Sequence, residues 1–202
     1  ADRNFRGRGQ KYDLDINAGL RNRDASFSVT EPYFLGREIS AGAELFYNDR
    51  NVGDIYDRRE IGADVTLGYK LTERLNQSWT YGLTQTEVSN IADNASLLIT
   101  QQAGTSIRSD ARHFLRYDRR DVAINPTEGY LLAMRNSLAG LGGSVRYLKT
   151  TAEATHYLPL GETFTFAARA EGGFIGGLGQ DTRLADRCVR GGGITRGCTT
   201  SG

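Results

Sequence analysis

The chain has 202 residues, enough for one large all-β domain, with 25 Lys and Arg against 24 Asp and Glu. This balance excludes the strongly basic surface that nucleic-acid binding usually needs, so we expect no nucleic-acid partner. The mean hydropathy is −0.46, and no window approaches the roughly 18 consecutive apolar residues of a transmembrane helix. Composition therefore argues strongly against a helical membrane protein.

Apolar and polar residues alternate from the N-terminal part of the chain onward, and this period of two predicts β-strands. In the first segment the polar positions include Asp13 and Asp15. Carboxylates at this spacing exclude an apolar core behind that face. The pattern recurs and predicts about nine strands, at residues 12–20, 25–30, 39–48, 61–69, 79–84, 111–119, 130–134, 148–158 and 164–174.

Strand and connection lengths point to a membrane barrel. Most segments have roughly the 9–11 residues that a tilted strand needs to cross a bilayer. Connections at 21–24 and 72–76 are short, whereas those at 49–58 and 90–109 are longer and polar. Short turns at one rim and long loops at the other are typical of outer-membrane barrels. We predict an antiparallel transmembrane β-barrel in the bacterial outer membrane, surrounded by lipid.

A soluble β-sandwich is the alternative, since its strands also alternate. Sandwich strands are usually shorter, with a mode of about 5–6 residues, and their solvated face would be rich in Lys and Glu. Here the polar face mixes Gly, Ser, Thr, Asp and Asn, which suits a confined polar lumen. Aromatic residues recur near strand ends, as they do at membrane interfaces: Tyr12, Tyr33, Phe34, Tyr47, Tyr69, Trp79, Tyr117, Tyr130 and Tyr157.

Residues that could carry chemistry are few. His113 and His156 are far apart in the sequence, and no His, Cys and carboxylate cluster has the spacing of a zinc site. The arginine-rich surroundings of Asp118 and Asp121 favour an ion-pair network in the lumen or at its rim over a carboxylate pair for acid/base catalysis. We expect no enzymatic activity and no bound cofactor or metal.

Glycine and cysteine gather toward the C-terminal end. The glycines at 172–173, 176–177 and 191–193 lack phosphate-binding spacing, so we expect them to permit bulges or a sharply bent loop. Cys188 and Cys198 have nine residues between them. A disulfide that closes a surface loop and a pair of free thiols both remain open.

Ordered motifs carry a resemblance to a known family. They are Thr-Glu-Pro-Tyr-Phe-Leu-Gly-Arg at 30–37, Tyr-Asp-Arg-Arg-Asp at 117–121, Asn-Pro-Thr-Glu-Gly-Tyr at 125–130 and Leu-Ala-Gly-Leu-Gly-Gly at 138–143. Together they resemble the BamA family of outer-membrane protein assembly factors, most closely its alphaproteobacterial members. The resemblance covers nearly the whole chain, in the order in which the family has these motifs.

The resemblance implies an organisation for the chain. Family barrels have sixteen strands and follow periplasmic POTRA domains. Residues 1–202 would then be a partial barrel domain, strands roughly three to eleven, with 180–202 forming part of the long sixth extracellular loop. The POTRA domains and terminal strands would lie outside this segment.

The resemblance also implies a function. The family folds and inserts client β-barrel proteins into the outer membrane without ATP, together with accessory lipoproteins. A two-partner secretion transporter of the same superfamily is the alternative, distinguished by having only two POTRA domains. The family's loop arginine pairs with lumenal carboxylates, so the functional motif here would comprise Arg196, Gly197, Gly191 and Gly192. Cys198 stands where the family has an aromatic residue.

Overall fold

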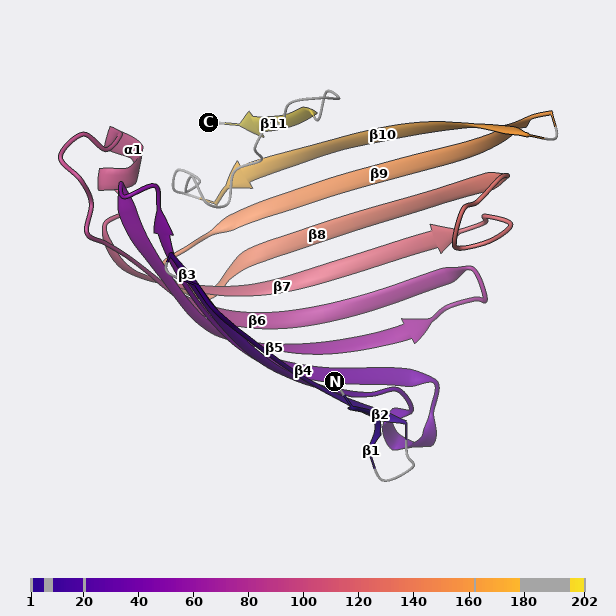
Figure 1. Cartoon of the computed structure of the whole chain (residues 1–202), viewed down its shortest axis with the longest axis horizontal. Helices are drawn as coiled ribbons and strands as arrows, with labels where there is room; N and C mark the ends of the chain where they lie inside the picture. The colour runs from indigo at the N-terminus through magenta and orange to yellow at the C-terminus, as the bar shows by residue number, and fades with distance from the viewer. Residues whose placement is uncertain (1, 6–8, 20, 162, 179–196, 202) are drawn as a thin grey trace.

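The computed structural model describes residues 2–5, 9–19, 21–161, 163–178 and 197–201. In this part of the chain a single eleven-stranded sheet has its strands side by side in chain order (Figure 1). Neighbours pair antiparallel, except the last two strands, which pair in parallel. The strands are β1 (Asp2–Phe5), β2 (Gln10–Ala18), β3 (Asn22–Glu31), β4 (Ile39–Val52), β5 (Tyr56–Lys70), β6 (Leu75–Ser89), β7 (Gly104–Asp118), β8 (Gly129–Gly143), β9 (Tyr147–Leu160), β10 (Phe164–Gly177) and β11 (Gly197–Ser201).

Strands β2–β10 correspond to the nine predicted segments, so the predicted all-β antiparallel fold is confirmed. The sequence pattern missed β1 and β11, because strands of four and five residues are too short to show a period of two. The sheet does not close, since β1 and β11 form its edges. Helical turns occur at η1 (Phe34–Gly36) and α1 (Leu97–Thr100), and no helix in the described ranges is long and apolar enough to cross a bilayer.

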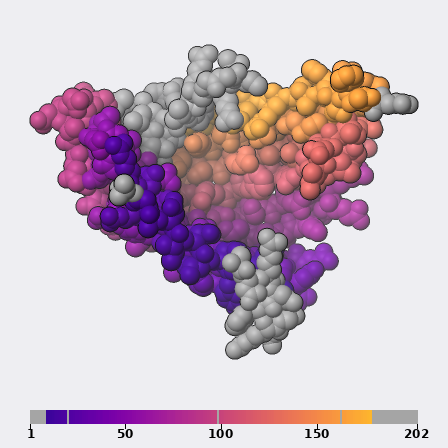
Figure 2. All heavy atoms as spheres, viewed as in Figure 1, coloured from indigo at the N-terminus to yellow at the C-terminus, as the bar shows by residue number. Residues whose placement is uncertain are grey.

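The sheet is curved into a trough, with β2–β4 along one side and β9–β10 along the other (Figures 1 and 2). Opposed residues in adjacent strands share a face, so the register sorts the side chains into two surfaces. On the outer face Leu45, Ala63 and Leu83 lie in one row. On the inner face Glu44 and Asp64 are opposed.

Curvature separates the two surfaces by exposure. Outer side chains splay apart on the convex side, and Val65 is 56% exposed. Inner side chains converge on the concave side, where the neighbouring Asp64 side chain is only 16% exposed. Among the described residues, buried apolar side chains cluster at Ala139, Val145, Tyr147 and Ile175, and the register places Ala139, Tyr147 and Ile175 on the inner face. Apart from this cluster the inner face is mainly polar, whereas the outer face is apolar, as a membrane barrel wall requires.

The rims differ from the prediction. Antiparallel order places the β2–β3, β4–β5, β6–β7 and β8–β9 connections on one rim, here called the α1 rim because it carries α1. The β3–β4, β5–β6, β7–β8 and β9–β10 connections lie on the opposite rim. The predicted sorting of short turns from long loops is wrong in part: the short β2–β3 turn shares the α1 rim with the long connection 90–103. The predicted loop 49–58 shrinks to 53–55, because β4 and β5 pair to their ends.

The β-bulge that we expected at the C-terminal glycines lies in another strand. β10 pairs with β9 in unbroken register through 172–173 and 176–177, so the expected bulge there is wrong. The bulge occurs in β8, where Arg108 opposes Gly143 but Asp110 opposes Ala139. Gly143 has φ +98°, and a Cβ there would collide with the Ile107 carbonyl oxygen. The family motif at 138–143 therefore encodes this bulge.

Residues 1–202 expressed alone should aggregate or exchange partners, because a lipid bilayer leaves the two edges of an open sheet without hydrogen-bond partners. Size-exclusion chromatography with light scattering measures this directly. The intact protein in detergent is the control and should elute as one species. A folded, monodisperse monomer of residues 1–202 in detergent-free buffer would contradict the expectation.

Candidate functional site

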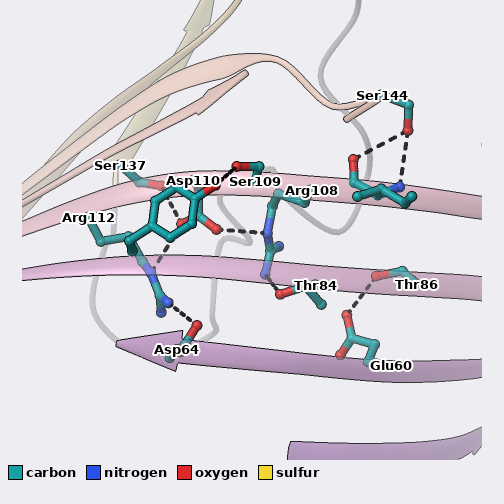
Figure 3. A network of polar contacts seen from close by, with 12 residues as sticks. Glu60, Asp64, Thr84, Thr86, Arg108, Ser109, Asp110, Arg112, Ser137 and Ser144 are labelled. Carbon is teal, nitrogen blue, oxygen red and sulfur yellow. Dashed lines mark hydrogen bonds and ion pairs between the residues drawn. The ribbon is translucent and has the colours of Figure 1, made fainter. Parts of the chain in front are cut away.

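The inner face of β5–β8 carries a network of ion pairs centred on Asp110 (Figure 3). The Asp110 side chain is 3% exposed and lies between two guanidinium groups. Its Oδ1 lies 3.4 Å from Nε of Arg108, and its Oδ2 lies 3.1 Å from Nε of Arg112. The Ser137 hydroxyl donates a hydrogen bond to Oδ2 at 3.4 Å. A carboxylate so deeply buried is stable only because cations and a donor surround it.

The network reaches across β5–β8 because Gly82 on β6 has no side chain to block it. The guanidinium of Arg112 on β7 passes over β6 and reaches Asp64 on β5, with Nη2 2.6 Å from Oδ1. Gly82 of β6 lies between them, and a Cβ there would be 2.5 Å from both groups. Arg108 donates a hydrogen bond to Thr84 Oγ1 at 3.4 Å. Side chains thus brace neighbouring strands from the lumenal side.

A second inner network lies on β8–β10. Arg169 pairs with Glu153 at 3.1 Å and with Glu171 at 3.5 Å. Arg135 reaches Glu153 at 3.9 Å and lies 4.9 Å over the Phe114 ring. The lumenal wall is therefore charged along much of its width, but its charges are largely paired within the wall.

The arginine-rich stretch lies at the rim opposite α1. Asp118 accepts hydrogen bonds from Arg120 Nε and Nη2 at 2.9 and 2.8 Å and from Arg116 Nη2 at 2.8 Å. The predicted ion-pair network is confirmed for Asp118. Asp121 plays another part: its carboxylate accepts hydrogen bonds from the Thr127 hydroxyl at 2.6 Å and from the Thr127 backbone N–H at 3.1 Å.

These contacts explain the spacing of the family motif. Asp121 closes the β7–β8 connection and also accepts from the Glu128 backbone N–H at 3.3 Å. The chain then turns at Gly129, whose φ is +102° and where a Cβ would collide with the Arg119 carbonyl oxygen. The conspicuous aspartates, threonine and glycine at 117–130 therefore build a rim brace.

The outer face carries a polar row that sequence reasoning missed. His113, which looked isolated in the sequence, stacks on Trp79 with ring centroids 4.4 Å apart. Its Nδ1 lies 3.2 Å from Asn136 Nδ2, and the Thr150 hydroxyl donates to Asn136 Oδ1 at 3.0 Å. These four residues are directly opposed on β6–β9. Hydrogen bonding within the row lowers the cost of polar groups on a membrane-facing surface.

The predicted loop motif lies largely outside the described residues, as do Arg196, Gly191, Gly192 and Cys188. Gly197 and Cys198 open β11, where they are opposed to Gly172 and Gly173 of β10 in parallel register. Anchoring of the loop by Arg196 and a disulfide between Cys188 and Cys198 stay predictions.

Asp110→Asn should lower the free energy of unfolding by about 3 kcal/mol, because two guanidinium groups lose the carboxylate between them. Reversible urea unfolding of the intact protein in lipid vesicles measures the change. Glu87→Gln is the control: Glu87 pairs with Arg59 at 3.5 Å, but these side chains are 41% and 55% exposed. That control should cost less than about 1 kcal/mol. Equal losses would contradict a special role for Asp110.

Acid should loosen the rim brace. The Thr127 hydroxyl, helped by backbone N–H groups, lowers the pKa of Asp121 from 3.8 to about 2. A lowered pKa means that the carboxylate stabilises the fold above pH 3.8 and that this contribution is lost as pH falls toward about 2.

Asp121→Asn should therefore flatten the acid limb of the stability profile in that window, and Thr127→Val should flatten it partly. Unfolding midpoints of the intact protein, measured from pH 5 downward to about 2, test this. Parallel acid limbs for the wild type and Asp121→Asn would contradict it.

Comparison with known proteins places this wall in a family. A family model described as the Omp85 superfamily domain matches residues 4–200. The outer membrane protein assembly factor BamA of Neorickettsia risticii (strain Illinois) is 28% identical over 191 residues, which are 92% of this chain and 26% of that protein. The sorting and assembly machinery component 50 homolog of Bos taurus is 32% identical over 194 residues, 94% of this chain and 41% of that protein.

A solved structure has the same fold. The crystal structure of BamA from Haemophilus ducreyi lacking POTRA domains 1–3 superposes with a TM-score of 0.81 and 21% identity, over 94% of this chain and 40% of that one. The chain spans about a quarter of the length of the curated BamA relatives. The predicted resemblance and the predicted location in the bacterial outer membrane are confirmed. The chain belongs to the Omp85 superfamily.

Proposed function

We propose that this chain forms barrel wall and part of the Arg-Gly loop in a protein that folds and inserts β-barrel proteins into the bacterial outer membrane. The observation that carries the proposal is the similarity to an outer membrane protein assembly factor along 92% of the chain. Similarity to a sorting and assembly machinery component along 94% of the chain supports it.

The wall would serve this function as a rigid frame. Paired charges inside and apolar side chains outside hold β2–β10 in one register, so that motion can be confined to other parts of the barrel. In this proposal the chain catalyses no covalent reaction, and client strands bind to the protein by strand addition. Its partners would be unfolded client barrels, accessory assembly lipoproteins and membrane lipid.

Reconstitution of the intact protein into liposomes tests the function. Added urea-unfolded porin should fold severalfold faster than in vesicles that contain an equal amount of an unrelated β-barrel, because the assembly factor lowers the barrier to insertion. Heat-modifiable gel mobility measures the folded client. Equal folding rates in the two kinds of vesicle would refute the proposal. If the protein transported a soluble passenger protein across the vesicle membrane and did not speed porin folding, that result would support the two-partner secretion transporter.

A further inference from the structure

The outer face of β7–β10 has an apolar hollow of about 620 Å³. Its floor is made of small residues on the last two long strands, Ala154, Ala170 and Gly172, and larger side chains such as Tyr117 and Met134 flank it. The register puts all five residues on the membrane-facing surface. This part of the wall therefore offers a concave, almost wholly apolar site where lipid chains would contact the protein.

Two cations lie at the rim end of this hollow. The Tyr130 ring lies 5.8 Å from the Tyr117 ring, measured between centroids, and the Arg119 backbone N–H donates a hydrogen bond to the Tyr130 carbonyl oxygen at 2.9 Å. Arg74, from the β5–β6 turn, lies beside the same strand end, where its backbone carbonyl oxygen accepts a hydrogen bond from the Asp118 N–H at 2.9 Å. Within the described ranges neither guanidinium forms an ion pair with a carboxylate. Two positive charges at the interface thus lack an acidic counterpart.

We infer that this surface binds one phospholipid molecule, with its phosphate on Arg74 and Arg119 and an acyl chain in the hollow. Guanidinium groups suit phosphate oxygens, and tyrosines at the interface suit the glycerol region. Tyr130 and Met134 are four residues apart on β8, about 13 Å along the strand. The cationic end and the apolar end of the site therefore follow one another along β8, as the headgroup and acyl chain do in a phospholipid.

Charge and shape together select this occupant. A free phosphate would use the arginines alone, and an apolar partner would use the hollow alone. On β5–β6 the corresponding surface is filled by bulkier groups, with Leu67 and Trp79 in one row. Lipid binding at this surface does not depend on the proposed assembly function.

Native mass spectrometry of the intact, delipidated protein tests the site, with palmitoyl-oleoyl phosphatidylglycerol as the probe. Wild type should retain one lipid at low lipid concentration. The double variant Arg74→Gln/Arg119→Gln should bind it about tenfold more weakly, because the phosphate loses both cations. Ala154→Leu/Ala170→Leu, which fills the hollow but keeps both arginines, should also lose about a factor of ten.

Matched controls are Arg37→Gln, an arginine at the same rim on the β3–β4 connection, and Ala63→Leu, on the outer face of β5. Both should bind as wild type does, and excess inorganic phosphate should not displace the lipid. Heat-modifiable gel mobility reports whether each variant is folded. Because the two double variants alter different parts of the site, one that misfolds leaves the other as the test. Wild-type retention by a folded hollow-filling variant would overturn the inference.

Discussion

Backbone hydrogen bonding without water is the constraint on which this structure depends. In a bilayer each peptide N–H and C=O of a spanning segment needs a partner within the protein, and neighbouring strands supply it here. From β2 to β10 the antiparallel ladder meets that need, and its register shifts at the bulge between β7 and β8. The ladder fixes the register, and the register decides which side chains face lipid and which face the lumen.

Inner-face charges follow from this register. Arg112 reaches Asp64 only because Gly82 leaves the intervening strand bare, and Asp110 remains a buried carboxylate only because Arg108 and Arg112 flank it. The same charges would be costly on the outer face, where lipid offers no partner. The wall thus uses ion pairs to hold strands together on the side where most side chains are polar.

Rim and outer surface add features that the ladder alone does not provide. The Asp118 and Asp121 contacts brace the β7–β8 connection at the rim. On the outer face, small residues of β9 and β10 leave a hollow that Tyr117 of β7 also lines. A lipid-facing wall can therefore carry specific sites as well as a uniform apolar band.

The sequence by itself determined the fold class, nine strands and the two faces, because a period of two is local and survives without knowledge of strand partners. Ordered motifs pointed to the family for the same reason. Only the tertiary structure decided the sides of the connections, the bulge at Gly143 and the partners of His113. Those depend on cross-strand register between residues 23 or more positions apart, such as His113 and Asn136, which no local pattern encodes.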